Sequence, residues 1–123
     1  MTINRGQIYL VNLDPVQDLR GPGREQRGRR PVLVVSSNAI NRQSLVVTVV
    51  VGTSAANVSK DYPTNVRIPP AESGLPKETV FLCFQLRSLD PARFAHAKPV
   101  RTLSAKRMEE IAAGLRLTLE LGG

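Results

Sequence analysis

The chain has little of several residue types on which many enzymes depend. Its 123 residues contain one cysteine, one histidine and no tryptophan. A single cysteine, Cys83, excludes an intrachain disulfide, and its apolar neighbours at residues 80–84 predict a buried, unreactive thiol. A single histidine, His96, excludes catalysis by a pair of histidines, and we expect it to be exposed and without a catalytic role.

Long hydrophobic runs and clustered acidic residues are also missing. No stretch approaches the roughly 18 apolar residues that span a bilayer, and residues 1–6 lack the apolar centre of a signal peptide. We therefore expect a cytoplasmic protein without membrane association. The ten acidic residues are scattered along the chain, whereas a two-metal nuclease gathers carboxylates around the phosphate. We expect neither a metal site nor a cofactor.

Positive charge is abundant. Seventeen lysines and arginines oppose ten acidic residues, giving a net charge of +7, and the pI is about 10.5. Such a balance attracts polyanions and favours nucleic acid as a partner. Residues 20–31 (RGPGREQRGRRP) hold five arginines and three glycines. Guanidinium groups bind phosphate oxygens in pairs, and glycine lets the backbone approach closely. Composition alone leaves a phosphate-binding loop and a solvated basic loop as equal alternatives.

The length suits one domain, residues 1–123. Met108 to Leu119 has helical spacing of apolar residues, and Ser104 is its expected N-cap. We expect most of the five aromatic residues in the core and no base-stacking platform. The fold predicted is mainly β with a C-terminal helix (α+β), a small SH3-like barrel or twisted antiparallel sheet. Alternating or β-branched runs predict its strands at 7–13, 32–35, 45–51, 65–68 and 79–84, the last extending toward 89.

Four segments occur in an order that resembles a known family. They are EQRGRRP at 25–31, VVVGT at 49–53, YPTNV at 62–66 and QLRSLD at 85–90. Together they closely resemble the MazF/PemK toxins, and the resemblance covers nearly the whole chain. It implies the small barrel-like architecture of that family. Two departures are a longer, more basic loop before Glu25 and an arginine, Arg24, where serine is common.

The resemblance implies a metal-independent endoribonuclease that cleaves single-stranded RNA. In that family the substrate's 2′-hydroxyl attacks the adjacent phosphate, which leaves a 2′,3′-cyclic phosphate and a 5′-hydroxyl end. Arg30 and Thr53 are then the catalytic pair, with Ser54 as the alternative to Thr53. Because a guanidinium stays protonated, we expect Arg30 to stabilise charge, Thr53 to position the phosphate, and Glu25 or solvent to handle protons. Expected substrate contacts are Arg24, Glu25, Gln26, Ser54, Gln85 and Arg87.

Other uses of these residues stay open. Gln85 and Arg87 are equally suited to be buried hydrogen-bond anchors. Glu25 and Gln26 are also suited to holding the basic loop in place. The resemblance implies a homodimer with RNA along a shared groove, and an acidic, partly disordered antitoxin as partner. The RNA sequence cut would depend on residues 16–29 and 53–63. The alternatives are a non-catalytic toxin of the same fold that poisons DNA gyrase, and a silent SH3-like module that binds RNA or protein.

Overall fold

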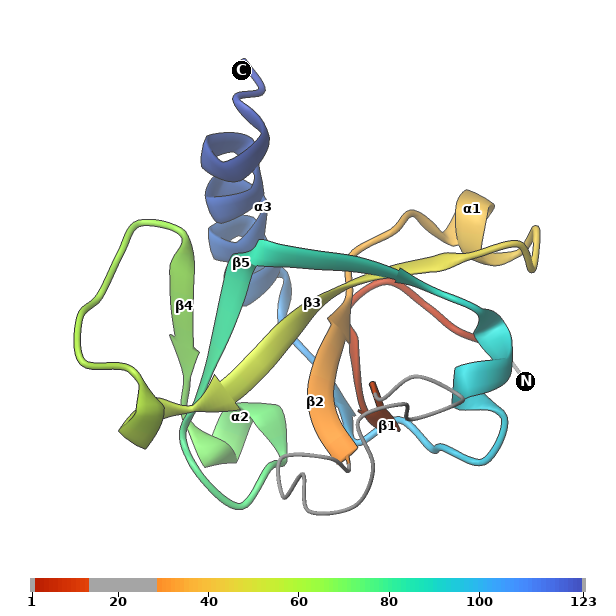
Figure 1. The fold of residues 1–123 in the computed structure, drawn as a ribbon, viewed down its shortest axis with the longest axis horizontal. Coiled ribbons are helices and arrows are strands. Elements are labelled where there is room, and N and C mark those ends of the chain that lie inside the picture. The colour runs from red at the N-terminus through yellow and green to blue at the C-terminus, as the bar shows by residue number, and fades with distance from the viewer. Residues whose placement is uncertain (1, 14–28, 123) are drawn as a thin grey trace, which may run out of the picture.

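The described part of the chain, residues 2–13 and 29–122 of a computed structural model, is built on one six-stranded sheet. Its strand order is β4-β5-β3-β2-β1-β6, and every neighbouring pair is antiparallel (Figure 1). The predicted mainly β fold with a C-terminal helix is confirmed. The strands are β1 (Gln7–Asn12), β2 (Arg29–Val34), β3 (Val47–Ser54), β4 (Asn65–Ile68), β5 (Thr79–Leu89) and β6 (Arg101–Thr102).

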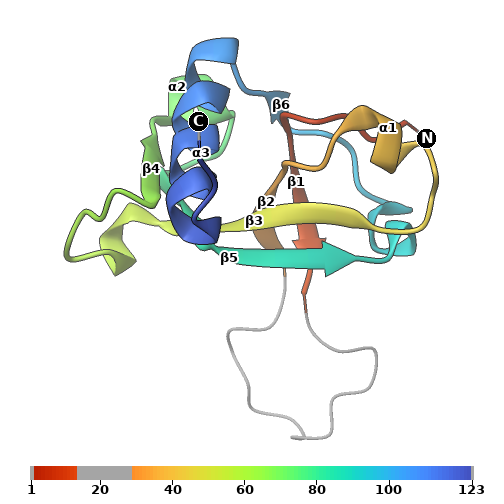
Figure 2. The ribbon, with the colours of Figure 1, turned by 90° about the horizontal axis from the view of Figure 1, so that it is seen from above.

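In the part of the chain that the structure describes, three α-helices and two short 3-10 helices connect or cover these strands. The long helix α3 contacts β5 and β4. Figure 2 shows α3 and α2 together at the β4 end of the sheet, away from α1. No helix within the described ranges has both the length and the apolar character needed to cross a membrane. The helices are α1 (Asn38–Asn41), η1 (Ala55–Asn57), α2 (Pro70–Ser73), η2 (Pro91–Phe94) and α3 (Ala105–Leu119).

Two apolar cores lie on opposite faces of the sheet because side chains alternate along a strand. In β2 and just beyond it, Leu33 and Val35 belong to the core under α3, whereas Val32 and Val34 belong to the other core. The first core also contains Phe81, Cys83 and Ile111, and the second contains Tyr9, Val11, Val47, Val49 and Phe94.

Helix α3 begins where the sequence predicts and packs closely on β5. The Ser104 side chain accepts a hydrogen bond of 3.2 Å from the Arg107 backbone N–H. At Gly114 an added Cβ would lie only 2.7 Å from the Cys83 Sγ, so glycine is what lets the helix approach the strand. Cys83 is fully buried, as predicted, and burial raises the pKa of its thiol to about 11. The thiol is therefore protonated at neutral pH.

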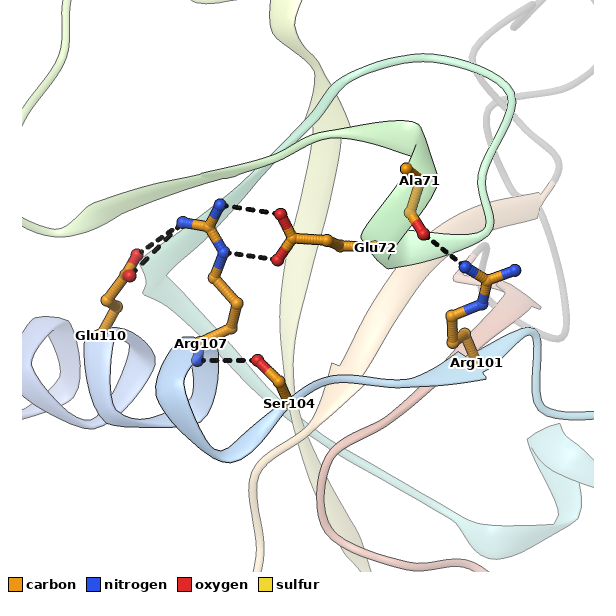
Figure 3. A network of polar contacts seen from close by, with 6 residues as sticks. All are labelled: Ala71, Glu72, Arg101, Ser104, Arg107 and Glu110. Carbon is orange, nitrogen blue, oxygen red and sulfur yellow. Dashed lines mark hydrogen bonds and ion pairs between the residues drawn. The ribbon is translucent and has the colours of Figure 1, made fainter.

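An ion-pair network ties α3 to α2 (Figure 3). The Arg107 guanidinium donates to both carboxylate oxygens of Glu72, at 2.7 and 3.0 Å, and to Glu110 at 3.1 Å. These hydrogen bonds, and then the positive charge of Arg107, lower the pKa of the Glu72 carboxyl. Nearby, Arg101 of β6 donates to the Ala71 carbonyl oxygen. Helix α2 and strand β6 are not predicted from the sequence, and these contacts help hold them in place.

Several predicted strand boundaries are wrong: β2 begins at Arg29 rather than Val32, and β3 extends to Ser54 rather than Val51. The strand expected from Leu45 begins at Val47, because Ser44 adopts a left-handed backbone with φ of 58°. Leu45 and Val46 remain exposed in the turn that follows α1. The run of β-branched residues predicts the strand itself correctly but not the turn that delays its start.

Candidate active site

A cleft of about 360 Å³ opens beside the ends of β2 and β3. Its walls come from four strands and from the connection between β3 and β4. Three of the predicted site residues, Arg30, Thr53 and Gln85, lie in it together. The described residues that line it are Arg30, Thr53, Asn57, Val58, Ser59, Lys60, Tyr62, Asn65, Leu82, Phe84 and Gln85.

Sheet register explains why Arg30 and Thr53 meet. Val32 of β2 pairs with Val51 of β3, in an antiparallel ladder. Arg30 and Thr53 lie two residues beyond this pair, one on each strand. Because side chains repeat every second residue along a strand, both are expected on the face of Val32 and Val51, and both line the cleft. Residues far apart in sequence thus come together in one cleft.

Ser54, the alternative to Thr53, lies on the other face of the sheet. It pairs with Thr79 and lines a separate, mostly apolar cavity of about 200 Å³ together with Leu10 and Pro31. Its hydroxyl also accepts a 3.4 Å hydrogen bond from the Ala56 backbone N–H and so caps η1. Moving one residue along a strand reverses the face of the side chain, and that separates the two hydroxyls.

The Thr53 hydroxyl is held by a neighbour. The Asn57 side-chain amide donates a 3.1 Å hydrogen bond to Thr53 Oγ1. Because the oxygen accepts this bond, its own hydrogen can be donated to a ligand in the cleft. The preceding residue, Gly52, lets β3 pack tightly on β5, since a Cβ there would lie 2.9 Å from Phe81 and from Thr79.

The charged groups of this cleft are cations. Among its described lining residues, Arg30 and Lys60 carry charge, and none is aspartate, glutamate or histidine. Arg30 is partly buried and pairs with Val11 of β1 in the ladder, so its backbone is fixed by a sheet neighbour. Two cations, one in β2 and one in the connection between β3 and β4, form a site suited to a phosphate. Residues 2–13 and 29–122 contain no group of three or more His, Cys, Asp or Glu placed to hold a metal.

Of the other predicted site residues, one lies away from the cleft and three are outside the described part of the chain. Arg87 lies farther along β5, opposite Val49, and is exposed without lining the cleft. Arg24, Glu25 and Gln26 lie outside the described residues. His96 is exposed, as expected, and does not line the cleft.

The sequence patterns do not identify several of the residues that line the cleft. Tyr9, Phe81 and Phe94 are buried, as predicted for the aromatic residues, but Tyr62 and Phe84 are exposed and line the cleft. Asn57, Lys60 and Asn65 were not singled out either. Most of them lie in or beside residues 53–63, the segment that begins at Thr53. That position along the chain is the sequence signal that could have identified them.

Comparison with known proteins gives a family match over almost all of the chain. Residues 4–119 match the family described as PemK-like, MazF-like toxin of type II toxin-antitoxin system. A protein of Staphylococcus saprophyticus named Endoribonuclease MazF is 35% identical over 119 residues, which cover 97% of this chain and 92% of that protein.

Solved structures agree with this match. A crystal structure of MazE-MazF from Deinococcus radiodurans superposes with a TM-score of 0.75 at 29% identity and covers 99% of both chains. A crystal structure of MazF from the same organism gives a TM-score of 0.72 at 30% identity and covers 98% of both. The curled antiparallel sheet with its C-terminal helix is therefore shared with these proteins.

Proposed function

This chain belongs to the PemK-like, MazF-like toxin family of type II toxin–antitoxin systems, and we propose that it is a sequence-specific, metal-independent endoribonuclease. Its substrate is single-stranded RNA in the cytoplasm. The observation that carries the proposal is that Arg30 and Thr53 line one cleft with Lys60, from different strands and a loop. A similar protein carries the name endoribonuclease, which supports the same reaction class.

The proposed reaction is an internal displacement at phosphorus. The 2′-oxygen of the RNA attacks the adjacent phosphate, and its proton leaves to a base. The bond from phosphorus to the 5′-oxygen breaks, and that oxygen takes up a proton. The products are a 2′,3′-cyclic phosphate and a 5′-hydroxyl end. Negative charge grows on the non-bridging oxygens during attack, and a guanidinium already aimed there stabilises it.

Each cleft residue has a distinct part in this proposal. Arg30 stabilises the charge that develops on the phosphate. Thr53 donates its hydroxyl hydrogen to a phosphate oxygen, and Asn57 holds the hydroxyl in position through its 3.1 Å hydrogen bond. Lys60 adds attraction for the backbone of the strand. Protons pass to and from Glu25 or solvent, because the described lining residues offer no carboxylate or imidazole.

The same charges support the proposed metal independence. Arg30 and Lys60 already supply positive charge where a nuclease metal would supply it, and they repel a divalent cation. A phosphate between these two side chains is neutralised without Lewis-acid help.

We also propose a homodimer and an acidic, partly disordered antitoxin as its partner. MazE-MazF complexes are known for the similar toxin of Deinococcus radiodurans. A chain with net charge +7 is suited to an acidic partner that folds on binding. Such a segment would compete with RNA for the cationic cleft.

The test is cleavage of a long single-stranded RNA in EDTA, with the cut sites and end groups mapped. Arg30→Ala is compared with Arg29→Ala, which removes the same charge from the neighbouring exposed position. We expect cuts at a short recurring sequence, cyclic phosphate and 5′-hydroxyl ends, and a loss of about 100-fold or more for Arg30→Ala alone. A folded wild-type protein that cuts nothing would contradict the proposal and favour a gyrase poison or a silent binding module.

A further inference from the structure

Two aromatic side chains of this chain are exposed in the same cleft. Tyr62 is 55% exposed and Phe84 is 52% exposed, whereas Tyr9, Phe81 and Phe94 are all fully buried. Both exposed rings line the cleft that contains Arg30 and Thr53. Singly exposed apolar residues are ordinary on protein surfaces, but two rings at one cationic cleft are a specific arrangement.

The backbone around Phe84 forces its ring into the cleft. Leu82 pairs with Val51 of β3, and the next pair joins Leu86 to Val50, so residues 83–85 have no partner on β3. β5 turns sharply beside α3 (Figure 1). The Cys83 side chain is anchored in the core under α3, and its neighbour Phe84 therefore faces the opposite side.

Tyr62 lies in a turn that a hydrogen bond and neighbouring ion pairs stabilise. Its carbonyl oxygen accepts a 2.8 Å hydrogen bond from the Asn65 backbone N–H, which closes the turn into β4. Beside it, Arg67 Nε lies 2.7 Å from Asp61 Oδ1, and Arg67 Nη1 lies 3.3 Å from Glu78 Oε1. The first ion pair ties Asp61, the residue before Tyr62, to β4, and the second ties the same arginine to Glu78 just before β5.

Asn65, which lines the cleft, has an unpaired polar atom. Among the described residues, none donates a hydrogen bond to its buried side-chain oxygen. Leaving a buried acceptor unpaired is unfavourable. A carboxamide both donates and accepts, as recognition of the edge of an unpaired base requires.

We propose that Tyr62 and Phe84 stack on unpaired bases of the RNA beside the scissile phosphate and so position that phosphate at Arg30 and Thr53. The inference rests on the proposed endoribonuclease function and deepens it, since it names the residues that hold the bases. Cationic grooves with aromatic faces are a common way of binding single strands. The two cations favour a phosphate-bearing strand over an apolar protein segment, which has no charge to place against them.

The test uses an oligonucleotide of 2′-O-methyl RNA, which cannot react because its 2′-oxygens carry no proton. It contains 2-aminopurine, whose fluorescence falls when it stacks. Tyr62→Leu and Phe84→Leu keep apolar bulk and lose the ring, whereas Tyr62→Phe and Phe84→Tyr keep a ring. Leu45→Ala, an exposed apolar residue in the turn before β3, is the control.

We expect each leucine variant to weaken binding about tenfold or more and to lose the fluorescence change. In cleavage of unmodified RNA it should raise KM more than it lowers kcat. The ring-keeping variants should retain the fluorescence change and bind more tightly than the leucine variants, and the control Leu45→Ala should stay within about twofold of wild type. Because the chain has no tryptophan, Phe84→Trp gives a second readout, namely quenching of its single indole by the bases.

The outcomes separate the two proposals. Leucine variants that bind and cleave like wild type, in a protein that does cut RNA, overturn the stacking role and leave the nuclease standing. Leucine variants that keep RNA binding but lose an acidic antitoxin peptide also overturn it and reassign the rings to a protein partner. A wild type that binds with quenching yet cuts nothing supports stacking and overturns the nuclease.

Discussion

The two faces of the sheet formed by β3 and β5 differ in how tightly their side chains are packed. On one face, Cys83 meets Gly114 of α3 so closely that no methyl group fits between them. On the other face, Phe84 is left half exposed at a cleft of about 360 Å³. The hydroxyls of Ser54 and Thr53 divide in the same way, one to each face.

Within a single strand, residues on the face under α3 therefore contribute to stability, and some residues on the other face line the candidate active site. The face under α3 consists of tightly packed apolar groups, and changes there alter the free energy of unfolding. The open face also holds the second apolar core, but at the cleft it carries a cation, a hydrogen-bonded hydroxyl and two exposed rings, which a maximally stable fold would not leave uncovered. We therefore expect substitutions one residue apart to affect different properties.

The largest effect is expected for Gly114→Ala, which should lower the stability of the face under α3. Helix propensity alone would make this change stabilising by about 1 kcal/mol. The added Cβ would instead lie 2.7 Å from the Cys83 Sγ, and such overpacking costs about 1–3 kcal/mol. Urea unfolding should show a lower midpoint for Gly114→Ala, with part of the loss recovered in the double variant with Cys83→Ala. A Gly114→Ala protein that is more stable than wild type would contradict the packing.

A smaller effect on the open face is expected for Asn57→Ala. Loss of the 3.1 Å bond to Thr53 Oγ1 frees the hydroxyl to rotate, and one such bond is worth about 0.5–1.5 kcal/mol. The rate of RNA cleavage should fall about 2- to 10-fold with little change in unfolding. Gln43→Ala, an exposed amide that does not line the cleft, is the matched control. Equal rates for the two variants would show that the bond does not position Thr53.

The smallest effect concerns the network that ties α3 to α2. Arg107 lowers the pKa of Glu72 in the folded protein, so the stabilisation is present above the unfolded value near 4.5 and is lost as pH falls. Glu72→Gln should lower the melting temperature at pH 7, and the difference from wild type should shrink at pH 3. Glu109→Gln, at an exposed position of α3, serves as the control. A difference that does not change with pH would mean that the charge of Glu72 is irrelevant.

Local patterns predict the strands and α3 because alternation and helical spacing are properties of neighbouring residues. Strand β6 has two residues and no apolar pattern, and its pairing with Gln7 and Ile8 depends on the rest of the fold. Helix α2 has four residues and is likewise held by contacts from β6 and α3. Elements this short carry too little sequence signal to be predicted alone.

The candidate site divides in a similar way. Arg30 and Thr53 follow from motif resemblance, but the choice between Thr53 and Ser54 depends on the β2–β3 register, which no local pattern contains. The exposure of Phe84 depends on the break in pairing at residues 83–85, and apolar neighbours make the same segment look like an ordinary buried strand. The sequence therefore predicts the candidate catalytic residues better than it predicts the other residues that line the cleft.

The most direct test of the central claim compares cleavage of the same RNA by Thr53→Val and Ser54→Ala. Valine keeps the β-branched shape of threonine and removes only the hydroxyl, and Ser54 lies on the opposite face. If the Arg30–Thr53 face performs the reaction, Thr53→Val should lose at least about tenfold in kcat, since a hydrogen bond to a charged group is worth about 1.5–3 kcal/mol. Ser54→Ala should stay within about twofold. A large loss for Ser54→Ala with an active Thr53→Val would contradict the account.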